Sequence, residues 1–101
     1  MTLEHKITFH GIPDEDHVET LVRERVERLP HFYDRVQSCR VVLESGPRVK
    51  VVVGVPHHEP IVVSHATADS PDATLESSVR DTFQLVERQL RHLHDQRIAR
   101  R

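Results

Sequence analysis

Several features on which small proteins often depend are scarce in this sequence. Its 101 residues include one cysteine, no tryptophan and four aromatic side chains, those of Phe9, Phe32, Tyr33 and Phe83. A single cysteine cannot form an intramolecular disulfide, which favours a cytoplasmic over a secreted protein. Because aromatic rings are so few, a hydrophobic core has to be built mainly from valine, leucine and isoleucine.

Long apolar segments are also absent. The longest run, residues 51–55, is far shorter than the roughly 20 residues that a transmembrane helix needs. Charges at Glu4 and Lys6 interrupt the N-terminus, so the pattern of a secretory signal is missing. We therefore expect no membrane partner, and a chain of this length predicts one domain over residues 1–101.

Hydrophobic periodicity predicts four strands and two helices. Alternating apolar and polar residues indicate strands over 3–10, 36–44, 49–55 and 61–68. Apolar residues at helical spacing indicate one helix over about 14–29 and a longer one near the C-terminus. The order β-α-β-β-β-α predicts an α+β fold, with two helices packed on one face of a four-stranded mixed sheet. The first two strands should be parallel if adjacent, and the last three should form an antiparallel meander.

Capping residues predict where the helices begin. Asp14 suits the N-cap of the first helix, and Pro30 ends that helix. Ser70 suits the N-cap of the second, with Pro71 at its first helical position. Each helix has one apolar stripe, formed by Val18, Leu21, Val22, Val26 and Leu29 in the first and by Leu75, Val79, Phe83, Val86, Leu90 and Leu93 in the second.

Charge is unevenly distributed along the chain. The whole sequence has 14 basic and 16 acidic residues, and this net charge of −2 argues by itself against a nucleic-acid partner. Residues 80–101, however, hold six arginines against three acidic residues, a net charge of +3. Residues 1–79 hold eight basic and 13 acidic residues, a net charge of −5. The average therefore conceals a basic C-terminal segment.

Arginines recur along the predicted second helix. Arg80, Arg88 and Arg91 fall on its solvent-facing side, while Arg25 and Arg28 belong to the first helix. Since both helices share one sheet face, these arginines are expected to line a common groove or ridge. Guanidinium groups make bidentate contacts with phosphate, and each neutralised phosphate releases counterions. The alternative interpretation is an ordinary solvated helix face with mixed charges.

Four segments, in this order and spacing, resemble a known family. They are Phe32-Tyr33-Asp34-Arg35, Val41-Val42-Leu43, His65-Ala66-Thr67-Ala68-Asp69 and Glu87-Arg88-Gln89-Leu90. Through them the chain resembles, over nearly its whole length, the ribosome hibernation-promoting factor / ribosome-associated translation inhibitor family in its short, single-domain form.

The resemblance implies a function and a set of site residues. Such proteins bind the small ribosomal subunit near the decoding centre, through basic helix residues on rRNA phosphates, and they preserve idle ribosomes under stress. Arg25 and Arg28 match basic positions of the first helix, and Arg88 matches the family's Arg-Gln-Leu motif. The fold is also similar to double-stranded RNA-binding modules, which recognise A-form shape. With the charge pattern, the predicted rRNA-binding residues are Arg25, Arg28, Arg80, Arg88, Arg91, Arg97, Arg100 and Arg101.

The chain also departs from the family pattern. Members usually carry a dense lysine run late in the second helix, but here Leu85, His92, His94 and Gln96 stand in that stretch. Weaker ribosome binding, or binding that depends on histidine protonation, is therefore expected. We expect no C-terminal dimerisation domain of the kind found in long members, and hence a monomer or a weak homodimer.

Other chemistries find little support in the residue pattern. His92 and His94 are two residues apart, whereas a helical zinc motif needs i,i+4 spacing. There is no nucleophile elbow, phosphate-binding loop or defined carboxylate pair. Cys39 shares a strand face with Val41 and Leu43, which predicts a buried structural thiol. We therefore expect no metal, no cofactor, no small-molecule substrate and no enzymatic activity.

Two functions of different classes remain. The predicted function is a ribosome-binding translation inhibitor whose arginines contact 16S-type rRNA and which blocks the path of messenger and transfer RNA. The alternative is a protein-interaction or dimerisation module of the same fold that has lost ribosome binding. Val52 and Val62, on the sheet face opposite the helices, would give such a module an apolar surface.

Overall fold

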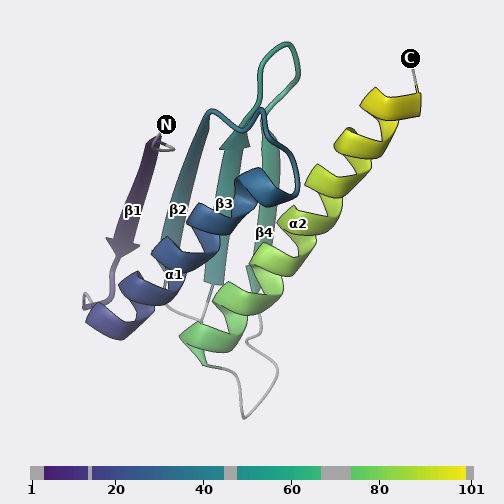
Figure 1. Ribbon diagram of the computed structural model, residues 1–101. Helices are drawn as coiled ribbons and strands as arrows, with labels where there is room; N and C mark the ends of the chain where they lie inside the picture. The colour runs from purple at the N-terminus through teal and green to yellow at the C-terminus, as the bar shows by residue number, and fades with distance from the viewer. Residues whose placement is uncertain (1–3, 14, 45–47, 67–73, 100–101) are drawn as a thin grey trace.

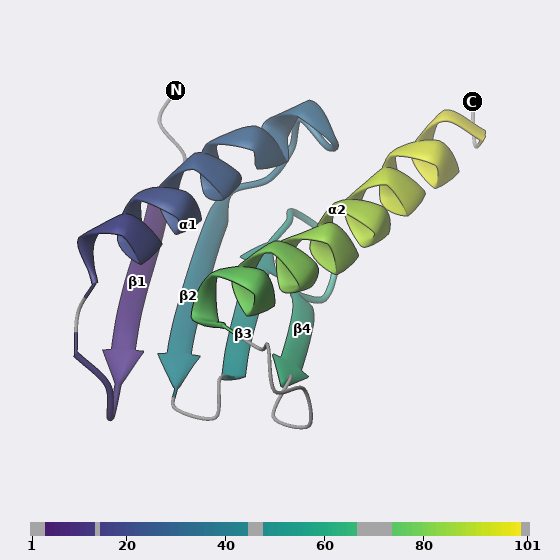
Figure 2. The same ribbon diagram turned by 90° about the horizontal axis from the view of Figure 1, so that it is seen from below.

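The strands and helices follow one another in the predicted order, β-α-β-β-β-α. The computed structural model describes residues 4–13, 15–44, 48–66 and 74–99 (Figure 1). Its elements are β1 (Glu4–His10), α1 (Asp16–Arg28), the 3₁₀ turn η1 (Leu29–His31), β2 (Ser38–Glu44), β3 (Arg48–Gly54), β4 (Ile61–Ala66) and α2 (Leu75–Ala99). Both helices lie against the same face of the sheet (Figures 1 and 2). The predicted α+β class is confirmed.

The sheet has the spatial order β1-β2-β3-β4. β1 and β2 are parallel, and the other two neighbouring pairs are antiparallel, as predicted. The register places Val41 opposite both Ile7 and Val51, and Val51 opposite Val63. Because side chains two residues apart point to the same side of a strand, such rows give the sheet one apolar face and one polar face.

Valine dominates the layer between the sheet and the helices. The buried residues of this layer are Val18, Val22, Val26, Leu29, Cys39, Val41, Leu43, Val49, Val51, Val53, Val55, Ile61, Val63, Val79, Phe83, Val86 and Leu90. Phe83 of α2 is the largest of the fully buried side chains. Burial of a valine or leucine side chain contributes about 1.5–3 kcal/mol. The predicted aliphatic core and both predicted helix stripes are therefore confirmed.

Some element boundaries differ from the prediction. β2 begins at Ser38 rather than at residue 36, because Ser38 is the outermost position that pairs with both Glu4 of β1 and Gly54 of β3. α1 begins at Asp16, with Glu15 at the cap position but without a side-chain hydrogen bond to the helix. The predicted cap Asp14 lies outside the described residues.

α2 begins at Leu75, later than the predicted start at Pro71. Thr74 and Ser77 cap this end reciprocally: Thr74 Oγ1 accepts the N–H of Ser77, and Ser77 Oγ accepts the N–H of Thr74, both at 3.1 Å. These two bonds satisfy backbone donors that an open helix end would leave unpaired. The predicted cap Ser70 and the adjacent Pro71 lie outside the described residues.

The long helix α2 is amphipathic. It has 25 residues, and the side opposite its apolar stripe exposes charged residues that include Arg80, Arg88, Arg91 and Asp95. Nowhere in the described parts of the chain does a helix combine the length and the apolar character that crossing a bilayer requires.

Cys39 lies within the buried layer, with 2% of its surface exposed. Burial raises the pKa of its thiol to about 12, because the thiolate would lose its hydration in the core. The predicted buried thiol is confirmed, and it packs as a small apolar side chain.

We predict that Cys39 resists thiol-modifying reagents in the folded protein and reacts readily once the chain is unfolded in urea. The raised pKa also has a consequence for stability. The thiol ionises near pH 9.0 in the unfolded chain but only near 12 in the folded one. This group therefore favours the unfolded state increasingly as the pH rises from 9 to 12, and has no effect at neutral pH. Rapid labelling under native conditions near pH 8 would contradict the buried placement.

Candidate nucleic-acid interface

Three of the predicted site residues, Arg25, Arg91 and Arg97, lie along the line where the α1 segment meets α2. Among the described residues, four contacts that involve a charged group connect the α1–η1 segment and the loop after it with α2. They are His17–Glu76, Arg25–Glu87, Phe32–Arg91 and Asp34–Arg97, and we call them the interhelix seam. The residue numbers rise together on both sides, in agreement with the similar direction of the two helices in Figures 1 and 2.

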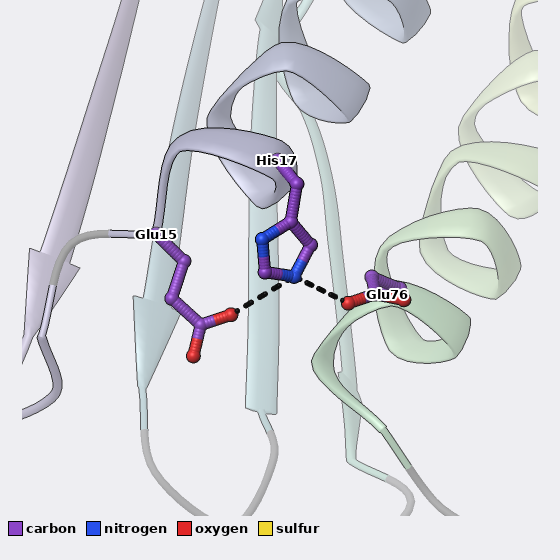
Figure 3. Close-up of side chains that lie close together, drawn as sticks. All are labelled: Glu15, His17 and Glu76. Atoms are coloured by element: carbon purple, nitrogen blue, oxygen red, sulfur yellow. Dashed lines mark hydrogen bonds and ion pairs between the residues drawn. The ribbon is translucent and has the colours of Figure 1, made fainter.

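The first contact of the seam joins the N-terminal ends of the two helices (Figure 3). His17 Nε2 lies 2.7 Å from Glu76 Oε1 and 3.3 Å from Glu15 Oε2. The three atoms, each of which could in principle coordinate a metal ion, lie within 4.8 Å of one another. An imidazole N–H shared between two carboxylates accounts for the geometry without a metal ion. Because all three side chains are substantially exposed, the cluster contributes little to stability.

The second contact is more deeply buried. Arg25 Nη1 lies 3.8 Å from Glu87 Oε2, and the two side chains are only 18% and 10% exposed. Glu87 Oε2 has no hydrogen-bond partner within the described structure, so the arginine is its nearest compensating charge. The structure therefore places Arg25, a predicted rRNA ligand, in an internal ion pair between the helices.

The third and fourth contacts hold the second half of α2. The Arg91 guanidinium carbon lies 5.4 Å from the centroid of the Phe32 ring, within cation–π range. Arg97 Nη1 donates a hydrogen bond of 3.0 Å to Asp34 Oδ1. Phe32 and Asp34 thus position α2, a role that sequence reasoning did not assign to them. No signal in the sequence showed this, because the partners lie about sixty residues apart.

Three predicted arginines remain outside the seam. Arg28 of α1 and Arg80 and Arg88 of α2 are exposed, and none of them forms an ion pair within the described residues. They are therefore the cations of the predicted set whose charge is most available to a ligand. Arg100 and Arg101, also predicted, lie outside the described residues.

Arg88 stands beside a surface hollow of about 520 Å³ between α2 and the start of β4. Polar side chains from both elements and from the preceding loop surround it, and Ile61 and Leu93 add apolar lining. The polar lining residues are His58, Arg88, Gln89, His92 and Gln96. The hollow therefore offers a guanidinium, two imidazoles and two amides to a ligand that combines negative charge with hydrogen-bonding groups.

The charge balance of the helix layer is less basic than the C-terminal segment suggests. α1 and α2 together contain seven arginines and eight acidic residues. Two of the acidic residues, Glu76 and Glu87, are occupied in the seam. The helices thus present separate arginines rather than a continuous basic surface.

A known protein family matches nearly the whole chain. The model of the family described as sigma 54 modulation protein / S30EA ribosomal protein matches residues 5–98. The chain belongs to this family. Within this S30EA-family chain, the seam connects the conspicuous Phe32–Arg35 segment with the helix that carries Glu87-Arg88-Gln89-Leu90. A search of curated proteins finds no match to the sequence.

Solved structures share the fold. The N-terminal domain of Protein Y from Thermus thermophilus has a TM-score of 0.74 at 20% identity, covering 91% of this chain and 99% of that one. A ribosomal subunit interface protein from Coxiella burnetii has a TM-score of 0.77 at 14% identity, covering 92% of this chain and 99% of that one. At such identities the similarity concerns the fold, and it agrees with the S30EA family match.

The seam predicts that Arg25 is needed for stability. Substitution Arg25→Ala leaves the buried Glu87 carboxylate without a counter-charge, so we expect the free energy of unfolding to fall by about 1–3 kcal/mol. The exposed Arg28→Ala is the matched control, with an expected change within about 0.5 kcal/mol. Urea denaturation measures both. Adding Glu87→Leu to Arg25→Ala should recover much of the loss. Equal stability of Arg25→Ala and Arg28→Ala would contradict the internal role of Arg25.

Proposed function

We propose that this domain is a ribosome hibernation factor that binds the small ribosomal subunit in the cytoplasm and inhibits translation. The observation that carries the proposal is the family match over residues 5–98, in a family whose description names a ribosomal protein. A protein of the same fold is described as a ribosomal subunit interface protein, which supports the same assignment.

The available arginines support rRNA as the ligand. Arg28, Arg80 and Arg88 project from the helix layer without internal partners in the described structure, and phosphate oxygens are the natural ligands of such guanidinium groups. Contacts of this kind fix position on RNA without reading its sequence. The hollow beside Arg88 has room for a nucleotide. The dependence of binding on histidine protonation stays a prediction.

The mechanism that we propose is occlusion. A domain bound near the decoding centre would occupy the space of messenger and transfer RNA, and inhibition then needs no chemical step. We accordingly propose a binding role rather than an enzymatic one.

One observation favours the alternative of an interaction or dimerisation module. Val62 is 52% exposed on the sheet face opposite the helices, and its register partner Val52 is only partly buried. The same face carries Arg40 and Lys50, however, and two copies placed face to face would bring these like charges together. Ribosome binding is therefore the better supported function.

The experiment is co-sedimentation with 30S and 70S particles at low and moderate salt. The wild-type domain is expected to sediment with the particles at low salt and to be released as salt rises, because phosphate contacts exchange with counterions. A triple variant, Arg28→Gln, Arg80→Gln and Arg88→Gln, is expected to bind more weakly at every salt concentration. The slope of its log binding constant against log salt concentration should be smaller by the equivalent of about three phosphate contacts.

The matched control is Arg23→Gln. Arg23 lies on α1 about 140° around the helix from Arg28 and pairs with Glu19 at 2.9 Å, so its loss should leave ribosome binding unchanged. Failure of the wild-type domain to co-sediment at low salt would refute ribosome binding. Undiminished binding of the triple variant would show that the helix arginines do not form the site.

A further inference from the structure

The sheet face opposite the helices is open to solvent and differs in chemistry from the helix layer. Figure 2 shows both helices on one side of the strands. The alternation of side chains directs to the other side Glu4, Lys6, Thr8, His10, Ser38, Arg40, Val42, Glu44, Arg48, Lys50, Val52, Gly54, Val62 and Ser64, all of them exposed or only partly buried. We call this surface the open sheet face.

This face holds the positive charge that the helix layer lacks. The four strands contain four basic and two acidic residues, whereas the two helices together contain one more acidic than basic residue. Both lysines of the whole chain, Lys6 and Lys50, lie here. The register places Lys6 beside Arg40, and Lys50 lies one strand further on, opposite Val42. Three neighbouring strands, β1, β2 and β3, thus each contribute one of these cations.

The charges of these three residues are not neutralised internally. Lys6, Arg40 and Lys50 are exposed and form no ion pair within the described residues. Arg48, by contrast, lies 3.9 Å from Glu44, so these two opposite charges offset each other. Glu4 at the edge strand is the remaining acidic group of the face. Lys6, Arg40 and Lys50 therefore form a basic cluster on this face, with Glu4 as the acidic group that the Arg48–Glu44 pair leaves over.

A hollow of about 300 Å³ adjoins this cluster, next to Lys6 and Arg40. Glu4, Ser38, Val52 and Gly54 are among its lining residues. The absence of a side chain at Gly54 leaves space beside Ser38, since a Cβ there would approach Ser38 Oγ to 2.5 Å. A phosphate with its sugar fits a space of this size, with one ammonium, one guanidinium and one hydroxyl as donors.

We propose that the open sheet face is a second RNA-binding surface, on which Lys6, Arg40 and Lys50 hold the phosphate backbone of an RNA segment distinct from the one at the helices. The inference rests on the proposed ribosome binding for the identity of the ligand. Phe9 packs against the core, Phe32 and Tyr33 follow α1, and Phe83 is buried, so none of these rings lies on the face. The imidazole of His10 does, at the end of β1 opposite Glu44 and four residues along the strand from Lys6. Recognition by Lys6, Arg40 and Lys50 is therefore through the phosphate backbone and independent of sequence.

The ribosome is a suitable partner for two such surfaces, because its RNA segments can surround a small domain. A two-layer domain with cations on both outer faces would then bridge two segments. Bridging also accounts for binding by a chain with few available helix cations, since each additional phosphate contact adds to the affinity.

The test compares two charge-neutralised variants of the full chain on 30S particles. One is the sheet variant, Lys6→Gln, Arg40→Gln and Lys50→Gln; the other is the helix variant with Arg28, Arg80 and Arg88 changed to Gln. In each variant, the slope of the log binding constant against log salt concentration should be smaller by the equivalent of about three phosphate contacts. Hydroxyl-radical footprinting should show that each variant loses protection of a different rRNA segment. Arg23→Gln serves as the control for the loss of a surface charge, and thermal unfolding confirms that each variant is folded.

The possible outcomes separate the two proposals. If the sheet variant binds with wild-type affinity, salt dependence and footprint, the second surface is refuted, while ribosome binding stands as long as the helix variant is impaired. If the wild-type domain itself does not bind 30S particles, the proposed function fails. If the sheet variant binds 30S normally but loses affinity for a polyglutamate peptide, the face serves an acidic protein, which also overturns the RNA assignment. Wild-type binding and footprint in Arg40→Lys, which keeps the native Lys6 and Lys50, would support a role for positive charge at position 40.

Discussion

The packing of two helices on one valine-rich sheet face constrains the position of every other group in this domain. Val41, Val51 and Val63 form a row across three strands, and α2 packs against the β3 and β4 end of this row. With few aromatic residues, the core depends on close contact of many small side chains, which requires both helices to lie flat on the sheet. The same packing brings α1 and α2 together along the interhelix seam and leaves the other sheet face uncovered.

Because the helices lie close together, some charged side chains contact other groups of the protein, while others stay available to a ligand. Where the helices meet, Arg25, Arg91 and Arg97 contact Glu87, Phe32 and Asp34, so their positive charge is partly used within the protein. Away from the seam, single arginines remain available on the helices, and Lys6, Arg40 and Lys50 remain available on the open sheet face. The net charge of −2 is thus compatible with RNA binding, because the basic groups that face solvent are concentrated at particular places.

The sequence predicted the elements well because their apolar periodicity is regular, as in the alternating valines of β3 and the stripe of α2. It did not predict the start of α2, because Ser-Pro at 70–71 and Thr74 with Ser77 are competing capping signals. Nor did it predict that Arg25 is internal. On a helical repeat Arg25 lies at the margin of the apolar stripe, and only the approach of Glu87 from α2 decides its environment. The cation cluster of the open sheet face was missed because its members come from three strands.

The most direct test of ribosome binding is a structure of the domain on the 30S subunit by electron cryomicroscopy. We expect the domain to lie near the decoding centre, with Arg28, Arg80 and Arg88 within contact distance of rRNA phosphates. Density for the domain with its helix layer turned to solvent, or particles that carry no such density at saturating protein and low salt, would contradict it.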